Sequence, residues 1–174
     1  SWSYNAKGEV VSADHSSTND LADRAYQFDS IGNRILAADG LDLAAPSAIS
    51  YATNTLNQYS TVGATARSFD DDGNLIDDGT KQYLWDAENR LLSVKQGATT
   101  LAEFAYDYQS RRISKTANGS NVTFVYDGWN PIAEYVDGSL AKTYTWGMDL
   151  SGTMQGAGGV GGLLSVNDGS ATYY

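Results

Sequence analysis

Phe104-Ala-Tyr-Asp107-Tyr-Gln-Ser110 and Phe124-Val-Tyr-Asp127-Gly-Trp-Asn130 are two copies of one pattern, and this pattern decides the fold. Each copy consists of an aromatic residue, any residue, a second aromatic residue, Asp, two further residues and a turn former. A pattern that recurs along a chain indicates a repeat architecture in which each copy is one supersecondary unit. The rest of the chain can be aligned to this unit.

Seven copies occur, and each opens a turn on Asp or Asn and closes it three residues later. The opening residues are Asn5, Asp29, Asn54, Asp70, Asp86, Asp107 and Asp127, and the closing residues are Gly8, Gly32, Asn57, Gly73, Asn89, Ser110 and Asn130. Asp or Asn at the first position of a type I turn accepts hydrogen bonds from N–H groups in the bend. Gly adopts the left-handed conformation of the fourth position freely, and Asn tolerates it. Because alternating aromatic residues are typical of strands, each copy predicts a β-hairpin tip.

A second set of turns lies between the tips and predicts the topology. Its members are short-hairpin dipeptides: Asp39-Gly40, Asp78-Gly79, Gln96-Gly97, Asn118-Gly119 and Asp137-Gly138. The segments between tips and turns have the usual length of strands. The abundance of Tyr (12), Trp (4) and Gly (18) is typical of strands joined by turns. We therefore expect an all-β fold, an antiparallel meander of β-hairpins forming a curved, shell-like sheet.

Two insertions and a Gly-rich C-terminal segment interrupt the alternation of tips and short turns. We expect residues 1–143 to form the repeat sheet, with loop insertions near 12–23 and 41–50, and residues 144–174 to form a separate Gly-rich segment. Thr18 could cap a helix in the first insertion, although the segment is too short for a stable helix. Pro46 indicates a loop in the second.

Charge and composition narrow the function classes. The net charge of −10 argues against nucleic acid as a partner, because binding phosphates needs a basic patch. Without cysteine there are no disulfides and no thiolate metal sites. No run of 18 apolar residues is present, so no membrane span is expected.

The repeats resemble the YD repeats of bacterial Rhs (rearrangement hot spot) proteins. The residues that carry the resemblance are Tyr26-Gln-Phe-Asp29-Ser-Ile-Gly32-Asn-Arg34, Trp85-Asp86-Ala-Glu-Asn89-Arg90-Leu91 and Tyr126-Asp127-Gly128, and Tyr144–Leu164 resembles the start of the Rhs core-associated region. The resemblance implies a non-catalytic, secreted or cell-surface bacterial shell that encloses or presents a polypeptide such as a toxin. It also implies partners in other repeats of the parent chain, or in copies of the chain joined through sheet edges. The Asp-Pro cleavage motif of Rhs toxins is missing, so neither self-cleavage nor a toxin is assigned.

Three features that could carry chemistry lack the context that the chemistry needs. His15 is the single histidine, and a triad is defined by geometry rather than by neighbours in sequence. The acidic run Asp70–Asp78 lacks the Gly and Glu of an EF-hand loop. Gly156–Gly161 matches a dinucleotide fingerprint, but no βαβ unit surrounds it. We therefore predict no catalytic residue, no metal ligand and no cofactor.

Exposed aromatic residues support an alternative function, an extracellular or cell-surface module that recognises glycans. Trp129 is the candidate ligand contact, because a Trp in a hairpin tip has little cross-strand packing to do. Asn118 and Asn121 lie in glycosylation acceptor sequences, which matter only in a eukaryotic secretory route. A glycosidase with paired carboxylates is a third hypothesis, but the hairpin tips already account for the Asp residues.

Overall fold

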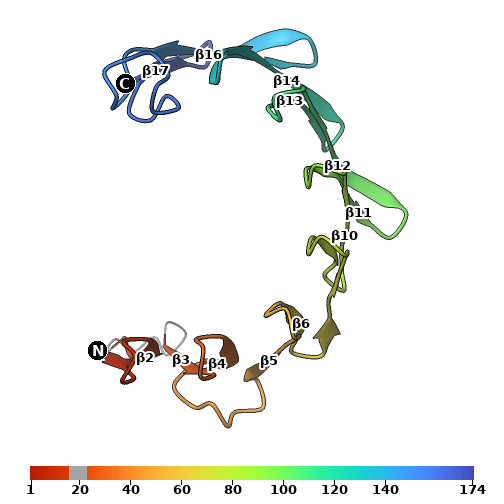
Figure 1. Ribbon diagram of the computed structural model, residues 1–174, viewed down its shortest axis with the longest axis vertical. Coiled ribbons are helices and arrows are strands. Elements are labelled where there is room, and N and C mark those ends of the chain that lie inside the picture. The colour runs from red at the N-terminus through yellow and green to blue at the C-terminus, as the bar shows by residue number, and fades with distance from the viewer. Residues whose placement is uncertain (16–22) are drawn as a thin grey trace. The chain divides into compact units, whose positions relative to one another are not determined.

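The computed structural model describes residues 1–15 and 23–174, and this part of the chain is all-β with no helix (Figure 1). It divides into two compact units, Ser1–Gly79 and Thr80–Tyr174. Every pair of neighbouring strands within each unit is antiparallel. The expected all-β antiparallel meander is therefore confirmed.

The first unit is a meander followed by a short hairpin. Seven strands form one sheet in chain order: β1 (Trp2–Tyr4), β2 (Val10–Ala13), β3 (Arg24–Phe28), β4 (Arg34–Asp39), β5 (Ile49–Thr53), β6 (Tyr59–Val62) and β7 (Thr65–Ala66). The hairpin consists of β8 (Ser68–Phe69) and β9 (Leu75–Asp77). The chain thus changes pairing partner at Arg67, between β7 and β8.

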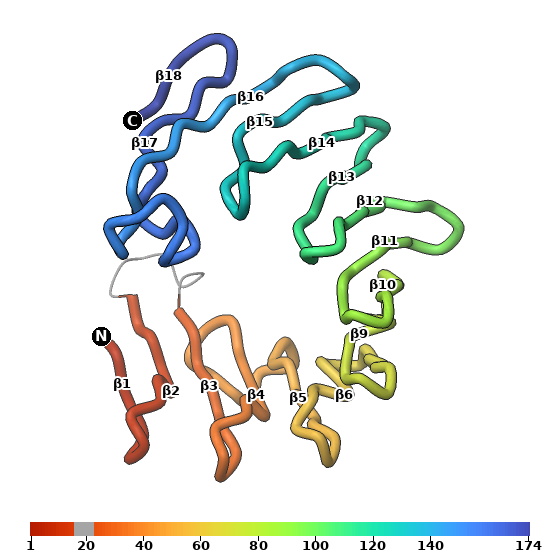
Figure 2. Tube along the Cα trace, turned by 45° about the horizontal axis from the view of Figure 1, so that its top comes forward, coloured from red at the N-terminus to blue at the C-terminus, as the bar shows by residue number. Residues whose placement is uncertain are grey.

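The second unit continues the same pattern with longer strands. Its strands also lie in chain order: β10 (Gln82–Trp85), β11 (Leu91–Gln96), β12 (Thr99–Tyr106), β13 (Arg112–Ala117), β14 (Ser120–Asp127), β15 (Asn130–Val136), β16 (Ser139–Trp146), β17 (Leu163–Asn167) and β18 (Thr172–Tyr173). Figure 2 shows the successive hairpins from β11 to β16, each beside its neighbour in the chain. The boundary expected between residues 143 and 144 falls inside β16, so this strand carries the repeat sheet on to Trp146.

A register shift marks each of the seven tips, always at the residue just before the Asp or Asn. In β12 the shift lies between Ala105 and Tyr106, and in β3 it lies between Gln27 and Phe28. The other five tips show it at the equivalent position. A type I turn followed by a left-handed residue is the hairpin connection that carries such a bulge.

The sheet has almost no conventional core. The buried apolar residues are all alanines (Ala13, Ala25, Ala37 and Ala38), and no large side chain in the described residues is fully buried. A single layer cannot bury large side chains between two faces. Contacts along the sheet, between side chains of neighbouring strands, must therefore supply most of the packing.

The two expected insertions are shorter than the sequence indicated. Ser12 and Ala13 still belong to β2, where they pair with β3, so the first insertion begins later. Thr18 and the rest of 16–22 lie outside the described residues. The second insertion is irregular from Gly40 to Ala48, and Ile49 and Ser50 already pair with β4 as part of β5.

Candidate functional site at the hairpin tips

Asp107 shows how a hairpin tip is built. Its backbone N–H donates to the carbonyl of Arg111 at 3.0 Å, and its own carbonyl accepts the Ser110 N–H at 3.0 Å. One carboxylate oxygen, Oδ1, accepts the N–H groups of Gln109 at 2.9 Å and Arg111 at 3.0 Å. Asp107 thus accepts the backbone N–H groups of Gln109, Ser110 and Arg111, three of the five residues of the turn.

Five other predicted tips have the same turn. The equivalent side-chain oxygen accepts N–H groups two and four residues on at Asn5, Asp29, Asn54, Asp70 and Asp86. The fourth residue is left-handed in all six, with φ of 61° at Ser110, 65° at Asn57 and 59° at Asn89, and positive φ at Gly8, Gly32 and Gly73. Ser110 adopts this conformation although it is neither Gly nor Asn.

The fifth residue of each turn completes the site, and it lies outside the repeat pattern of the sequence. Where the turn opens on Asp, the fifth side chain donates to the second carboxylate oxygen, as Asn33 does to Asp29 at 2.8 Å. Where the turn opens on Asn, the amide donates instead, as Asn54 does to Gln58 at 2.8 Å. Asn74, Arg90 and Arg111 follow the first rule and Glu9 follows the second. A carboxylate only accepts hydrogen bonds, whereas an amide also donates them. Donor–acceptor complementarity between the first and fifth residues of the turn is therefore visible in the sequence.

These hydrogen bonds keep the tip carboxylates ionised. The Asn33 side chain lowers the pKa of Asp29, and the Asn74 side chain does the same for Asp70. Burial would raise the pKa of Asp107, but the hydrogen bonds and charge of Arg111 outweigh it, and the pKa falls below its ordinary value. Hydrogen bonds to the charged form of an acid favour that form.

Side chains of one tip also bind the next tip along the sheet. Arg90 donates to the Asp107 carbonyl at 3.2 Å, and Arg111 donates in the same way to the carbonyl of Gly128. In the first unit Gln58 donates to the Gly73 carbonyl at 3.1 Å. Asn33 to Asn57 and Lys7 to Ser30 are further contacts of this kind. Successive tips within each unit are therefore joined into a row, which we call the tip row.

The tip at Asp127 departs from the prediction. Asn130 was expected to be the left-handed fourth residue, but it begins β15, pairs with Asp127 and is only 3% exposed. The left-handed residue is Gly128, with φ of 56°. The reason lies in Pro131, the fifth residue, because it has no N–H to donate to the Asp127 carboxylate. The chain instead closes a two-residue turn over Gly128 and Trp129.

Gln155, from the Gly-rich segment, replaces the missing partner. Its Nε2 donates to the Asp127 carbonyl at 2.7 Å, and its Oε1 accepts the Trp129 N–H at 3.0 Å. A Cβ on Gly128 would lie 2.0 Å from the Gln155 Oε1, so this approach requires glycine. The Gly-rich segment thus packs onto the last predicted tip.

Asp149 opens an eighth turn that the alignment missed. Its N–H donates to Thr153 at 2.7 Å, Gly152 N–H donates to its carbonyl at 2.9 Å, and Gly152 has a φ of 75°. The second carboxylate oxygen accepts the N–H groups of Ala157 at 2.6 Å and Gly159 at 3.2 Å. The Ser151 hydroxyl and these N–H groups lower the pKa of Asp149 to about 2. Met148 replaces the aromatic residue before the Asp, which hid the copy from the aromatic pattern.

In the second unit, aromatic residues before three of the turns connect a repeat to the preceding one. The Tyr106 hydroxyl donates to the Leu91 carbonyl at 3.0 Å, and Tyr126 donates to Arg112 at 2.9 Å. Trp146 donates through Nε1 to Pro131 at 2.6 Å. Each acceptor lies four or five residues after the preceding Asp. The aromatic residue of the repeat therefore acts both as packing surface and as hydrogen-bond donor.

Two arginines lie between the rings of successive repeats. Arg34 stacks on Tyr26 and Tyr51 at 4.8 and 5.6 Å from the ring centroids. Arg112 stacks on Phe104 and Phe124 at 5.8 and 5.1 Å. Both arginines occupy the position five residues after a tip Asp, so this contact is a second repeating link between strands.

Trp129, the predicted ligand contact, is 55% exposed in its tip. It is one of several apolar tip side chains that point to solvent, together with Ile31, Leu56, Tyr108 and Leu150. Turn positions normally hold polar residues. These exposed apolar side chains are therefore an unusual feature of the turns.

The other candidates have structural surroundings. His15 lies at the edge of the Trp2 ring, with centroids 6.3 Å apart, and its Nδ1 is 3.9 Å from Asp23. Within residues 1–15 and 23–174, no group of His, Cys, Asp or Glu could hold a metal ion. Asn118 is exposed, whereas the Asn121 amide binds Thr116 at 2.9 Å. No helix in the described chain is long and apolar enough to cross a membrane.

A comparison with known families matches residues 1–154 to the teneurin YD-shell model. The chain belongs to the YD-shell family. The resemblance of the sequence to YD-repeat and Rhs proteins is thereby confirmed. YD-shell membership and the all-β fold together make the chain a shell-like structural module.

Curated relatives of this YD-shell chain include large bacterial nucleases. It is 34% identical over 127 residues to the tRNA nuclease WapA of Bacillus subtilis strain 168, and equally so to the tRNA3(Ser)-specific nuclease WapA of Bacillus spizizenii. These matches cover 70% of the chain but only 5% of each relative. The chain thus spans about one twentieth of their length.

Solved structures show the same YD-shell fold. The crystal structure of TcdB2–TccC3–TEV superimposes with a TM-score of 0.55 at 14% identity, over 94% of this chain and 11% of that one. TcdB2–TccC3–Cdc42 gives a TM-score of 0.53 at 14% identity, over 83% and 10%. At this identity the likeness concerns the fold.

Proposed function

We propose that this chain is a non-catalytic segment of a secreted bacterial YD-repeat shell whose sheet encloses or presents a polypeptide such as a toxin. The observation that supports this most directly is the use of the tip carboxylates. Asp29, Asp70, Asp86 and Asp107 each bind backbone N–H groups with one oxygen and a side chain with the other. Carboxylates committed in this way serve the turn and leave little capacity for acid–base chemistry.

The lack of a conventional core also favours the role of a shell wall over that of a compact catalytic domain. Within residues 1–15 and 23–174 the buried apolar residues are four alanines, and the strands are held by links from each repeat to the next. Such nearest-neighbour links allow a sheet to be extended repeat by repeat. The partners that we propose are therefore other repeats of the parent chain, or copies of this chain joined through sheet edges, and an enclosed polypeptide.

The nuclease relatives bear on the same proposal. Their names assign tRNA cleavage to proteins of which this chain matches 5% of the length. The matched region contains YD turns whose residues are engaged in the tip row. We propose that it corresponds to shell wall in those proteins, with their nuclease activity carried elsewhere.

Limited proteolysis of the full-length protein tests this function. The polypeptide that the shell encloses is expected to resist protease in the wild type and to become sensitive when Asp86→Ala and Asp107→Ala open two neighbouring tips. Lys95→Ala, at an exposed residue of β11, serves as the surface control. Equal protease sensitivity of wild type and variant would reject enclosure, and tRNA cleavage by the purified 174-residue chain would reject a non-catalytic role.

Trp129 supports the alternative, glycan recognition. The residue is 55% exposed at the end of the tip row, where a sugar ring could stack on its indole ring. Binding to a glycan array that disappears in Trp129→Ala but persists in Tyr108→Ala, an aromatic residue exposed on another tip, would favour this function.

A further inference from the structure

Arg67 differs from every other arginine of the chain. The other five have a partner, which is a carboxylate for Arg24, Arg90 and Arg111 and an aromatic ring for Arg34 and Arg112. Among residues 1–15 and 23–174, the Arg67 guanidinium has neither kind of partner. Its Nε is buried without a hydrogen bond, as is that of Arg34, but Arg34 stacks on two rings. Arginine always carries its charge, so an unpaired, partly buried guanidinium is costly.

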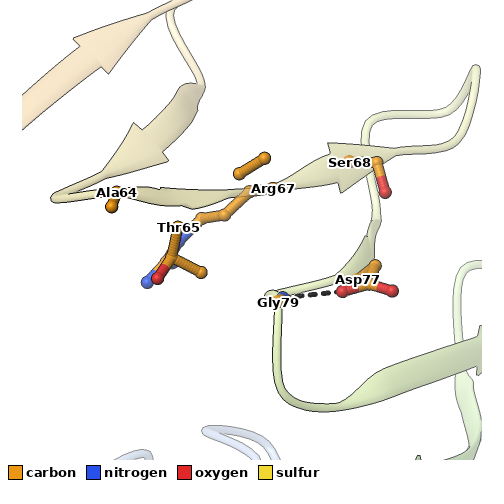
Figure 3. A pocket seen from close by; sticks show the side chains of 7 residues that line it. Ala64, Thr65, Arg67, Ser68, Asp77 and Gly79 are labelled. Atoms are coloured by element: carbon orange, nitrogen blue, oxygen red, sulfur yellow. Dashed lines mark hydrogen bonds between the residues drawn. The ribbon is translucent and has the colours of Figure 1, made fainter.

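The position of Arg67 explains this isolation. It lies three residues before Asp70, where six of the seven copies have an aromatic side chain. It also lies where β7 pairs back to β6 while β8 pairs forward to β9. The change of partner leaves a pocket of about 500 Å³ lined by Ala64, Thr65, Ala66, Arg67, Ser68, Asp77 and Gly79 (Figure 3).

The polar groups of this pocket come from both strand segments that border it. Thr65 and Arg67 project from the same side of one segment (Figure 3), as residues two apart in an extended chain do. Asp77 comes from β9, and its Oδ1 accepts the Gly79 N–H at 2.6 Å (Figure 3). No ion pair joins Asp77 to Arg67, although both line the pocket.

A second Arg–Asp pair in the same unit forms the expected contact. Arg24 Nε lies 3.3 Å from Asp39 Oδ1, and this pair lines a smaller cavity of about 160 Å³. The Arg67 pocket is larger and its two charges stay apart. It therefore offers a guanidinium donor and a carboxylate acceptor to a guest that can bind both.

We propose that the Arg67 pocket binds a small carboxylic acid that carries a hydrogen-bond donor on the adjacent carbon, as α-amino and α-hydroxy acids do. The ligand carboxylate binds the Arg67 guanidinium, which matches it in a planar, two-point geometry. The adjacent ammonium or hydroxyl group donates to Asp77. Asp77 would repel a simple anion, Arg67 would repel a simple cation, and the volume suits a small molecule.

Side-chain NMR of the intact chain tests the proposal directly. The Arg67 Nε–H resonance is followed while glycine, glycolate, acetate or methylammonium is added. We expect saturable shifts with glycine and glycolate, and affinities at least about tenfold higher than for acetate or methylammonium. The ratio of glycine to glycolate distinguishes an amino from a hydroxy acid. Equal affinities for acetate and glycine, or the lack of a saturable shift, would overturn the proposal.

Two substitutions separate the roles of Asp77 and Arg67 in ligand binding. The backbone amide resonance of Gly79 reports binding in both variants. Asp77→Asn keeps the oxygen that accepts from Gly79 but removes the charge, so we expect glycine to bind about tenfold more weakly and acetate more tightly. Arg67→Lys should abolish binding of both, whereas Arg112→Lys, the same change on another strand, should leave it intact. The backbone amide spectrum verifies the fold of each variant. Tighter binding of glycine by Asp77→Asn would show a simple anion site and refute the proposal.

Discussion

Arg111 binds the Asp107 carboxylate of its own hairpin tip through two nitrogens, Nε at 2.7 Å and Nη2 at 2.6 Å from Oδ2. Its third nitrogen donates to the Gly128 carbonyl in the next tip, and its Cζ lies 5.0 Å from the Tyr126 ring centroid. One side chain therefore closes a turn and links it to the following repeat. Two-point binding of a carboxylate is more specific than a single surface ion pair.

Replacing Arg111 with alanine should lower the melting temperature by several degrees. The substitution removes the partner of Asp107, the bond to Gly128 and the stacking on Tyr126 together. Differential scanning calorimetry measures the change. Lys95→Ala removes the same charge from an exposed position of β11, where no ion pair is formed, and should leave the melting temperature nearly unchanged. Similar shifts in the two variants would show that charge alone matters.

Valine at the left-handed glycines should destabilise the fold more than valine at Ser110. Gly73 has a φ of 87°, and a Cβ there would lie 3.1 Å from the Gln58 Nε2. Gly32 is equivalent, with a φ of 95° and the Glu9 carboxylate at 3.0 Å. A left-handed conformation costs a residue with a Cβ about 1–2 kcal/mol, and Ser110 already bears this cost. Urea denaturation gives the three free energies of unfolding, and equal losses would contradict this reading of the turns.

Gln155→Ala should loosen the Gly-rich segment from the tip at Asp127. The substitution removes the bonds to the Asp127 carbonyl and the Trp129 N–H, so the Trp129 amide should exchange with solvent at least about tenfold faster. Hydrogen exchange followed by NMR measures this rate. Gln109→Ala, at the exposed third position of the Asp107 turn, is the matched control. An unchanged rate at Trp129 in Gln155→Ala would mean that other contacts hold the segment.

Acid should destabilise the chain through its turn-forming aspartates. The pKa of Asp149 is lowered to about 2, and those of Asp29 and Asp107 are also lowered, by hydrogen bonds to the charged form. The pKa of these carboxyl groups is lower in the folded chain than in the unfolded chain, where it is about 3.9. Such a group stabilises the fold at pH values above the unfolded pKa, and this stabilisation is lost as the pH falls through the folded pKa. Melting temperatures should therefore fall between about pH 4 and pH 2, where Asp149 takes up its proton.

Asp149→Asn tests how much this one carboxylate contributes to the loss of stability in acid. The variant should be less stable than wild type at neutral pH, and its stability should depend less on pH below 4 than that of the wild type. Gln109→Ala, which changes an exposed turn residue that carries no charge, should retain the wild-type slope. Parallel curves for wild type and Asp149→Asn would show that this carboxylate does not govern the acid transition.

Much of the fold could be predicted because its main signal is local. The type I turn, its left-handed residue and the bulge before it involve residues no more than about five positions apart, so the pattern around Asp107 also locates the turns at Asn5 and Asp86. The prediction failed at Asn130 because Pro131 removes the N–H that the turn needs. It missed Asp149 because aromatic residues were given more weight than the hydrogen bonds of the turn.

The candidate site was less predictable because its contacts cross between repeats. Ser110 occupies a left-handed position because Asp107 and Arg111 organise the turn around it, although its residue type does not favour that conformation. The Arg34 stack on Tyr26 and Tyr51 depends on the lateral order of three strands. Such contacts follow from strand pairing and register, which no short window of sequence contains.

The amino-acid sequence by itself determined where the chain turns, because each tip is closed by hydrogen bonds among residues that are close along the chain. Only the tertiary structure decided what those tips touch. It places Gln155 on a tip 28 residues earlier in the chain and leaves Arg67 without the partner that every other arginine has. Both outcomes depend on which strands pair side by side, and this pairing is a property of the assembled sheet.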